Sequence, residues 1–326
     1  MKITNLIETD QSSLHQTTFI ADVIAGLSAQ EKAISAKYFY DDIGSELFQK
    51  ITQHPDYYPT STEFSILQSI NHLLPGIINA SELDIIELGA GDGHKSELII
   101  NGFLNHDCKV NFYPIDISEK AMQLLDDNLS THPSLHTHGV VADYFHGLNY
   151  LKKISSNKKL VLFLGSNIGN FNKVQIDSFL SQLQDSLDTG DYVLVGFDLK
   201  KDTHVLNQAY NDADGLTRQF NLNLLNRINR ELGGDFNVSA FEHYGFYNPK
   251  LGAMESYLIS LDDQIVTIEA ADKPFYFTQH EAMHLEYSYK FSTAAITQLA
   301  VQNGFTITQL FSDSRDYFID ALWQVT

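Results

Sequence analysis

The sequence has little cysteine and little positive charge. Cys108 is the only cysteine in 326 residues, so no disulfide can form within one copy of the chain, which fits a reducing compartment. Lys and Arg number 21 against 41 Asp and Glu, and this net charge of −20 disfavours binding to DNA, RNA or an anionic membrane. The simplest remaining partner is a small neutral or zwitterionic molecule.

Long apolar runs are missing as well. No stretch approaches the ~20 apolar residues that span a bilayer. Residues 1–13 lack the basic and then apolar segments of a secretory signal. We therefore expect a soluble, cytoplasmic protein that acts as a monomer. With 43% hydrophobic and 12% aromatic residues, the chain can bury a full core and form more than one substructure.

The middle of the chain alternates between strands and helices. Segments rich in Val, Ile, Leu or Phe indicate strands buried on both faces, as in a parallel sheet with right-handed crossovers. The expected strands cover residues 84–90, 110–116, 136–143, 160–166 and 191–199. Apolar residues at helical spacing lie between them at 94–100, 119–129 and 173–187.

The C-terminus predicts a helix at 292–302 and then two strands, 305–311 and 317–324, that form an antiparallel pair. A parallel sheet that ends in an antiparallel hairpin is the usual outline of methyltransferases that depend on S-adenosylmethionine (SAM), although a fold alone never fixes a function. We therefore predict an α/β fold with such a Rossmann-like sheet. This SAM-binding domain would cover residues 62–199 and 287–326.

Two regions fall outside that sheet. Residues 1–61 precede its first strand, and residues 200–286 form an insertion too long for a simple loop. The insertion predicts a helix at 214–232 and a hairpin at 254–268 that turns at Asp262 and Asp263. We expect the two regions to form a second, smaller α+β domain that binds substrate or acts as a lid.

The glycine-rich stretch from Glu87 to Gly93 joins the first strand to a helix. Glycine allows positive φ and lets a ligand approach the backbone. The spacing is G-x-G-x-G, and a dinucleotide fingerprint would need glycine where His94 stands. With Glu87 before the turn, the pattern favours SAM over NAD, while a turn without a ligand remains the alternative. The predicted cofactor-binding residues are Glu87, Gly89, Gly91, Gly93, Lys95, Asp116 and Asp143.

Two of these residues, Asp116 and Asp143, end the second and third strands. Ligands of such sheets lie outside the carboxyl ends of the strands. Asp116 could there accept both ribose hydroxyl protons of an adenosine, and Asp143 could reach the adenine amino group. Alternatively, each aspartate caps the helix that follows.

The loop from Gly165 to Phe171 follows the fourth strand, where the transferred methyl group would lie. Its polar side chains, Asn170 among them, can hold a substrate carboxylate or amine. Alternatively, the loop is a left-handed turn in which Asn170 bonds its own backbone. The Asn/Asp-Pro-Pro-aromatic motif of nucleic-acid amino methyltransferases is absent, in agreement with the charge.

Three further patterns allow more than one interpretation. Glu286, Ser288 and Lys290 alternate and would share one face of a strand, which is either a binding face or a solvated one. His280–His284 matches H-E-x-x-H, but its aromatic flanks favour a strand, whereas zinc binding requires a helix, so we predict no metal. Thr60–Glu63 could suggest a phosphate site, but the spacing of Thr60 and Glu63 before an apolar run favours a capping box.

An N-terminal tyrosine block makes the chain resemble a known family. The chain resembles the ergothioneine-pathway histidine Nα-methyltransferases, SAM-dependent enzymes that convert histidine to its trimethylated betaine, hercynine. The likeness covers nearly the whole chain. The residues that carry it include Tyr38–Asp41, Gly44–Phe48, Tyr57–Thr60, Thr62–Glu63, Glu87–Gly89, Phe163–Ser166, Ile168–Asn170, Asp198–Leu199, Ala209–Tyr210, Asn229–Leu232, Phe241–His243 and Glu286, Ser288 and Lys290.

The resemblance implies roles for individual residues. Asn170 and Tyr210 would hold the substrate carboxylate, and Tyr40 would lie near the amino group. Tyr57, Glu286 and Ser288 would bind the imidazole ring, and a charge-assisted bond would join Glu286 to a ring N–H. Ser256 stands where the family's histidine enzymes place a methionine against the ring. Tyr40, Asn170 and Tyr210 would be the catalytic residues, and S-adenosylhomocysteine would be the second product.

Other functions remain open at this point. The same chemistry on another amino acid, for example tryptophan, is one alternative, which Ser256 favours and Glu286 disfavours. A SAM-binding protein without catalytic activity is a second alternative, and a zinc protease is a third.

Overall fold

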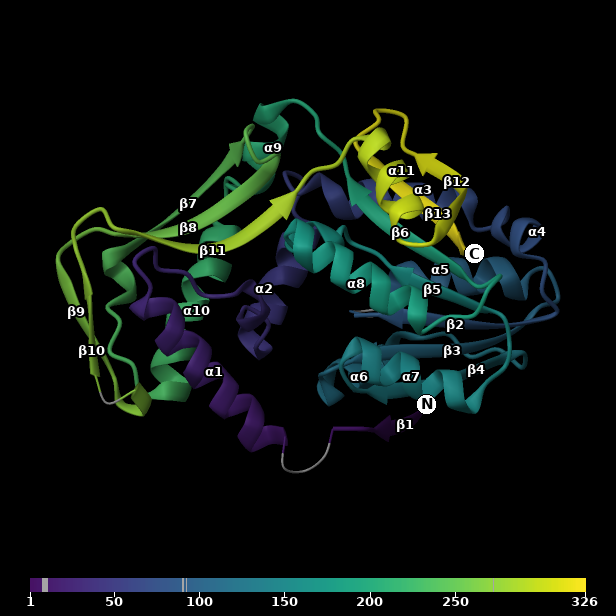
Figure 1. The fold of residues 1–326 in the computed structure, drawn as a ribbon, viewed down its shortest axis with the longest axis horizontal. Coiled ribbons are helices and arrows are strands. Elements are labelled where there is room, and N and C mark those ends of the chain that lie inside the picture. The colour runs from purple at the N-terminus through teal and green to yellow at the C-terminus, as the bar shows by residue number, and fades with distance from the viewer. Residues whose placement is uncertain (8–10, 90, 92, 272) are drawn as a thin grey trace. The chain divides into compact units, whose positions relative to one another are not determined.

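The computed structural model describes residues 1–7, 11–89, 91, 93–271 and 273–326 (Figure 1). The chain divides into two compact units. Unit 1 contains Thr62–Lys200, Phe291–Thr326 and the first residues of the chain, and unit 2 contains Lys201–Lys290 and the N-terminal segment that ends at Ser61. The expected division differs at three points. The N-terminal strand belongs to unit 1, because it pairs with β4. Lys200 also belongs to unit 1, and unit 2 continues to Lys290 rather than to residue 286.

Among the described residues of unit 1, eight strands form one sheet. The first six strands in the sheet order run parallel, and the last two pair antiparallel, so the predicted parallel sheet and C-terminal hairpin are confirmed. The order is β1 (Lys2–Asn5), β4 (Leu135–Val141), β3 (Lys109–Asp116), β2 (Glu82–Leu88), β5 (Lys159–Phe163), β6 (Tyr192–Asp198), β13 (Phe318–Val325) and β12 (Phe305–Ser312).

Helices lie on both faces of this sheet (Figure 1). Every residue of β5 and β6 is buried, as expected for strands covered on both sides. Ser118 caps α6 by accepting a hydrogen bond from the Ala121 N–H at 3.1 Å. The helices of unit 1 are α4 (Leu74–Ile78), α5 (His94–Leu104), α6 (Glu119–Asn128), α7 (Tyr144–Ile154), α8 (Lys173–Asp185) and α11 (Thr293–Gln302), and α3 (Tyr58–Ile70) crosses the border between the units.

Unit 2 is built on a small antiparallel sheet in the order β11 (Ala282–Tyr289), β8 (Ala253–Ser260), β7 (Phe241–Asn248). The predicted helix is present as α10 (Leu216–Leu232), and it packs against β7 and α2. A second core, in which Phe39, Leu224 and Leu258 are fully buried, lies among these elements. The remaining helices of this unit are α1 (Gln11–Ser28), α2 (Asp42–Gln53) and α9 (Thr203–Ala209).

The hairpin predicted at residues 254–268 is wrong. β8 is the central strand of its sheet and pairs with β7 and β11 on its two sides. The next strand, β9 (Gln264–Ile268), pairs instead with β10 (Lys273–Phe277). Both hydrogen-bonding edges of β8 are therefore used, and the turn at Asp262 leads out of the sheet.

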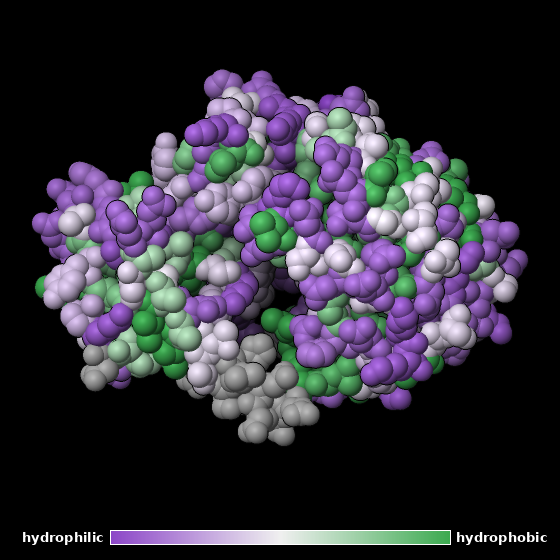
Figure 2. All heavy atoms as spheres, viewed as in Figure 1, coloured by the Kyte–Doolittle hydropathy of each residue, from purple (hydrophilic) through white to green (hydrophobic). Residues whose placement is uncertain are grey.

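The surface in view in Figure 2 is mostly hydrophilic, with apolar residues interspersed among polar ones. This pattern is typical of a globular surface. Among the described residues, no helix is long and apolar enough to cross a bilayer. Cys108 is buried and carries a free thiol.

Candidate active site

The glycine turn after β2 has the conformation that its sequence predicts. Gly89, Gly91 and Gly93 have φ values of 76°, 55° and 79°, a region that L side chains rarely adopt. A Cβ on Gly93 would lie 2.3 Å from Leu125 Cδ1, so this glycine is needed for packing. A Cβ on Gly91 would meet no atom within 4 Å, so here a ligand can approach the backbone. Ala90 and Asp92, which belong to the predicted motif, lie outside the described residues.

Asp116 and Asp143 follow parallel strands at the same edge of the sheet as the glycine turn. Asp116 accepts a hydrogen bond from the Ser118 N–H at 2.9 Å, and burial raises the pKa of its carboxyl despite the neighbouring backbone N–H groups. Strand β4 ends at Val141, two residues earlier than expected. Asp143 instead caps α7 through the Phe145 and His146 N–H groups. The capping interpretation thus holds for Asp143, and a contact with the cofactor stays a prediction for both residues.

The loop after β5 is held in a left-handed conformation. Gly165 has φ 78° and Ser166 has φ 57°, and the Ser166 hydroxyl accepts a hydrogen bond from the Asp198 N–H at 2.9 Å. A short 3-10 helix, Asn167–Asn170, follows. Among the residues that the structure describes, the half-buried Asn170 amide has no hydrogen-bond partner, so it does not bond its own backbone. This amide is available to a ligand.

A buried charge cluster ties the glycine turn to that loop. Lys95, in the first turn of α5, forms an ion pair with Glu63, and the other oxygen of Glu63 accepts a hydrogen bond from the Gly165 N–H at 2.7 Å. Burial opposes the charge on Lys95, but Glu63, Asp320 and Glu87 outweigh it and raise its pKa. Burial and the neighbouring Glu63 raise the pKa of Asp320 well above its ordinary value.

The predicted capping box at Thr60 and Glu63 is wrong. Helix α3 begins earlier, at Tyr58, so Glu63 lies within the helix. Its side chain is fully buried over β6, where a Cβ on Gly196 would lie 2.2 Å from Glu63 Oε1. The spacing suggested the start of a helix. Instead, Glu63 lies buried against Gly196, where it pairs with Lys95 and accepts a hydrogen bond from the Gly165 N–H.

In unit 2, a β-bulge sets which residues of β11 share a face. The register between β11 and β8 shifts between His284 and Glu286. Met283 is opposite Leu258, and after the bulge Glu286 is opposite Ser256. Directly opposed residues lie on one face, so the polar residues continue the face that carries core residues. Ser288 and Lys290 are buried and Glu286 is half-buried, so the alternative of a solvated face for these three residues does not hold for Ser288 and Lys290.

The hydroxyls of Tyr210 and Ser288 and the ammonium of Lys290 form a closed triangle in unit 2. Lys290 Nζ donates to Tyr210 Oη at 2.9 Å and to Ser288 Oγ at 2.8 Å, and Tyr210 Oη donates to Ser288 Oγ at 2.7 Å. All three side chains are buried. The ammonium also lies 4.8 Å from the centre of the Tyr210 ring. The sequence placed Lys290 on this face but gave it no role.

Glu286 is the exception in this polar cluster. Among the described residues, no group hydrogen-bonds or forms an ion pair with its carboxylate. Burial raises the pKa of Glu286 to about 7, although Lys290 acts in the opposite direction. The side chain is half-buried, and a carboxylate with a raised pKa and no partner within the described part of the protein is typical of a site that receives its partner from a ligand.

The predicted tyrosines join the same unit through a series of aromatic contacts. The Tyr40 ring centre lies 5.5 Å from Phe48, Phe48 lies 6.2 Å from Tyr57, and Tyr57 lies 6.3 Å from Tyr210. Aromatic faces with polar tips suit a small amphipathic or cationic ligand. Tyr40, Tyr57, Tyr210, Ser256, Glu286 and Ser288, predicted from separate parts of the sequence, all belong to unit 2.

The H-E-x-x-H pattern does not form a metal site in the described part of the chain. His280 has φ 67° in a turn, and His284 lies on strand β11. The described residues contain no group of His, Cys, Asp and Glu side chains that could hold a metal ion. The expectation that the aromatic flanks favour a strand is confirmed.

Comparison with known proteins assigns the family. A profile described as histidine-specific methyltransferase, SAM-dependent, matches residues 19–325. The histidine N-alpha-methyltransferase of Mycolicibacterium smegmatis is 35% identical over 294 residues, which is 90% of each chain. The Mycobacterium tuberculosis protein of the same name is 34% identical over 276 residues, or 84% of this chain and 85% of that one. Ergothioneine biosynthesis protein 1 of Schizosaccharomyces pombe is 26% identical over 284 residues, or 84% of this chain and 36% of that one.

These matches confirm the family resemblance that the N-terminal tyrosine block and the residues Glu286, Ser288 and Lys290 predict. They run through both units of the chain. The protein belongs to the family of SAM-dependent, histidine-specific methyltransferases.

Proposed function

We propose that this protein transfers methyl groups from SAM to the α-amino nitrogen of L-histidine and forms hercynine for ergothioneine biosynthesis. The observation that carries the proposal is the half-buried Glu286 carboxylate, which has no hydrogen-bond partner among the described residues and lies on the same face as the buried Ser288 hydroxyl. A carboxylate is a strong acceptor for an imidazole N–H. The names of the relatives in Mycolicibacterium smegmatis and Schizosaccharomyces pombe support the reaction and the pathway. The free, buried Cys108 is compatible with the cytoplasm, where we place the enzyme as a monomer.

We place SAM in unit 1, at the carboxyl edge of the parallel strands. The open space at Gly91 and the positive φ values of the turn fit a ligand that lies against the backbone. The sulfonium group of SAM supplies the methyl group. The residues proposed to hold SAM are Glu87, Gly89, Gly91, Gly93, Lys95, Asp116 and Asp143. Lys95 would act with Glu63, because the two already form an ion pair.

We place the amino acid in unit 2. Glu286, Ser288 and Tyr57 would bind the ring, and Ser256, opposite Glu286, would line the same face. Tyr210 would bind the carboxylate and Tyr40 the amine, and for Asn170, which belongs to unit 1, a role at the carboxylate stays the one that the resemblance implies. Ser256 stands where the family's histidine enzymes have a methionine. Met254, two residues before Ser256 and opposite Ser288, is buried and would supply an apolar side chain on the same face.

The chain's task in the reaction is to present an unprotonated amine. The nitrogen lone pair forms the new N–C bond as the C–S bond breaks, and each methylation releases one proton. Positioning of this kind can contribute as much as ~7–11 kcal/mol of the barrier. The product of three methylations is a cation without an N–H, which tyrosine faces such as Tyr40 can hold.

Mass spectrometry of the protein incubated with SAM and a pool of the standard amino acids tests the proposal. We expect histidine to gain one, two and finally three methyl groups. Methylation of tryptophan instead of histidine would show that the enzyme catalyses the same reaction on the alternative substrate. SAM binding without any S-adenosylhomocysteine would indicate a protein that only binds SAM. In Tyr40→Phe or Asn170→Ala, we expect slower methylation with unchanged SAM binding.

A further inference from the structure

We propose that Lys290 determines ring specificity, as a positioning residue that fixes the direction of the Ser288 hydroxyl. The inference rests on the proposed binding of histidine in unit 2. Lys290 does not need to touch the substrate for this role. It acts by occupying acceptor sites on two hydroxyls, so that Ser288 can meet the ring only as a donor.

The direction follows from a count of protons and lone pairs. A hydroxyl has one proton and two acceptor lone pairs. Ser288 Oγ accepts one hydrogen bond from Lys290 at 2.8 Å and a second from Tyr210 at 2.7 Å. Both of its lone pairs are therefore used, and its own proton must point away from the other two groups. A phenol is also a stronger acid than an alkyl alcohol, which makes Tyr210 the natural donor of this pair.

The face then presents one donor and one acceptor. Ser288 offers its O–H, and Glu286, two residues earlier on the same strand and face, offers its carboxylate. A neutral imidazole has one N–H and one bare nitrogen, so it satisfies both groups. The indole of tryptophan has an N–H but no acceptor nitrogen, and it would leave the Ser288 proton buried and unpaired. Such a buried, unmatched donor is what makes a polar site selective.

The opposite arrangement would have a different consequence. If Tyr210 turned its proton toward a substrate carboxylate, Ser288 would donate to Tyr210 and would meet the ring as an acceptor. Two acceptors, Ser288 and Glu286, would then fit a doubly protonated imidazolium. In the arrangement that we propose, the proton of Tyr210 is directed to Ser288. The positive charge of Lys290, which donates to Tyr210 Oη, then attracts the substrate carboxylate to this position.

A pair of nearly isosteric substrates tests this role. In 3-(pyrrol-3-yl)alanine, a C–H replaces one ring nitrogen of histidine and removes the acceptor. For the wild-type enzyme, we expect kcat/KM to favour histidine over this analogue by about tenfold or more, because Ser288 keeps an unpaired donor. In Lys290→Met, Ser288 can direct its proton to Tyr210, so we expect the preference to fall to within about threefold.

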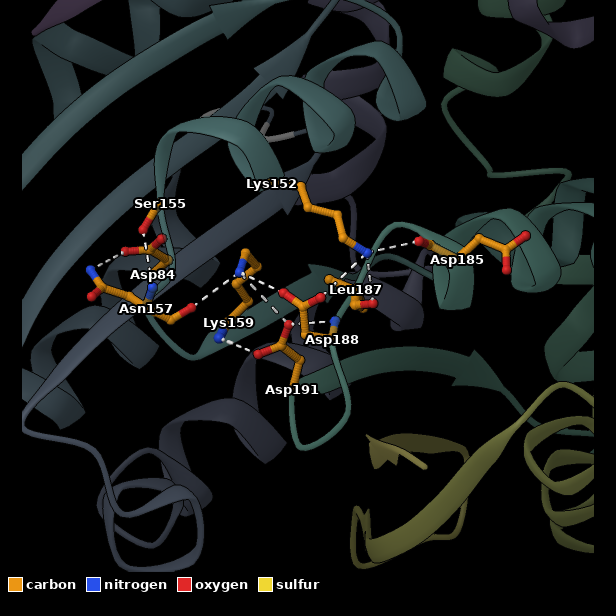
Figure 3. A network of polar contacts seen from close by, with 9 residues as sticks. All are labelled: Asp84, Lys152, Ser155, Asn157, Lys159, Asp185, Leu187, Asp188 and Asp191. Atoms are coloured by element: carbon orange, nitrogen blue, oxygen red, sulfur yellow. Dashed lines mark hydrogen bonds and ion pairs between the residues drawn. The ribbon is translucent and has the colours of Figure 1, made fainter.

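A second buried lysine provides the matched control. Lys159 is 2% exposed, starts β5, and lies 3.1 Å from the Asn157 carbonyl oxygen and 3.6 Å from Asp188 (Figure 3). Lys159→Met also removes a buried ammonium, but from a network in unit 1 at the amino end of the strand. It should lower stability and leave the ratio between the two substrates unchanged. This control separates a loss of stability from a change in specificity.

The outcomes separate the inference from the proposed function. An unchanged substrate ratio in Lys290→Met, or equal kcat/KM for both substrates in the wild type, would overturn the role of Lys290 while histidine methylation stands. An absence of S-adenosylhomocysteine with histidine would instead overturn the proposed function. If Lys290→Met does not fold, ¹⁵N NMR of ring-labelled histidine bound to the wild type decides. One protonated and one bare ring nitrogen are expected, and two protonated nitrogens would contradict the proposal.

Discussion

Each unit holds a lysine near carboxyl groups, half-buried Lys95 in unit 1 and buried Lys290 in unit 2, but the two lysines are used differently. In unit 1, Lys95 forms an ion pair with Glu63, whose second oxygen is hydrogen-bonded to the Gly165 N–H. In unit 2, Lys290 binds two hydroxyls, and Glu286 is left without a hydrogen bond among the described residues. The Lys95–Glu63 pair has its partners within the protein, although both oxygens of the buried Asp320 beside it lack a hydrogen bond in the described part of the chain. Glu286 in unit 2, by contrast, is a half-buried acceptor that a ligand can reach.

This difference separates a positioning cluster from a binding cluster. A buried charge that has its partner strengthens the local structure only if the geometry is kept, and removing one partner is costly. A buried carboxylate without a partner lowers stability and is retained where a ligand needs it. The comparison thus predicts opposite effects on stability for substitutions of the two glutamates.

The largest effect on stability is expected for Glu63→Ala. The substitution leaves the half-buried Lys95 without its ion pair, the Gly165 N–H without its acceptor, and a cavity where the fully buried Glu63 side chain stood. We expect a loss of about 3–5 kcal/mol in the free energy of unfolding. Denaturant unfolding followed by circular dichroism measures it, and a loss below about 1 kcal/mol would show that the cluster does not hold the loop.

Glu286→Gln is expected to stabilise the protein at alkaline pH. Burial raises the folded-state pKa from 4.5 to about 7, so the stability that this group contributes is complete below pH 4.5 and is lost as pH rises through 7. The amide removes that loss, so we expect a gain of about 3 kcal/mol at pH 8 that vanishes near pH 4.5. Glu242→Gln, at an exposed position of β7, is the matched control without this gain. Equal stability curves for the wild type and Glu286→Gln would contradict an unpaired carboxylate.

Gly91→Ala is expected to weaken SAM binding with little loss of stability. The new Cβ has no atom within 4 Å, and the φ of 55° costs about 1 kcal/mol. We expect roughly tenfold weaker SAM binding in calorimetry, because the methyl group occupies the approach to the backbone. Gly215→Ala, with φ 70° and open space in unit 2, carries similar strain and should leave SAM affinity unchanged. Equal SAM affinity in the two variants would show that SAM does not bind against the glycine turn.

The smallest effect is expected for Asp320→Asn. Burial and Glu63 raise the pKa of this carboxyl well above its ordinary value, so we expect a neutral amide of the same shape to change the free energy of unfolding by less than about 1 kcal/mol near neutral pH. Denaturant midpoints compared with those of Glu63→Ala measure the contrast. A loss as large as that of Glu63→Ala would mean that Asp320 is ionised and paired.

Local patterns predicted most of unit 1. Apolar runs placed all seven expected strands within a few residues, because strands covered on both faces leave a strong signal. The glycine turn was equally clear, since its positive φ values require glycine. The roles in unit 2 came from the resemblance rather than from spacing, and the structure places those residues together in that unit.

The errors have long-range causes. The spacing of Thr60 and Glu63 matches a capping box, and only the packing of Glu63 on Gly196 shows another role. The hairpin at 254–268 failed because β8 and β9 each found a partner elsewhere in the chain. Strict alternation also could not show the bulge before Glu286 or the contact of Lys290 with Tyr210, which is 80 residues away.

The most direct test of the account is calorimetric titration of L-histidine into the wild type, Glu286→Gln and Glu242→Gln, each saturated with S-adenosylhomocysteine. A charge-assisted bond to the ring predicts roughly 10- to 100-fold weaker histidine binding in Glu286→Gln alone, with equal affinity for S-adenosylhomocysteine in all three proteins. Wild-type histidine affinity in Glu286→Gln would contradict the assignment of unit 2 as the site that binds the ring.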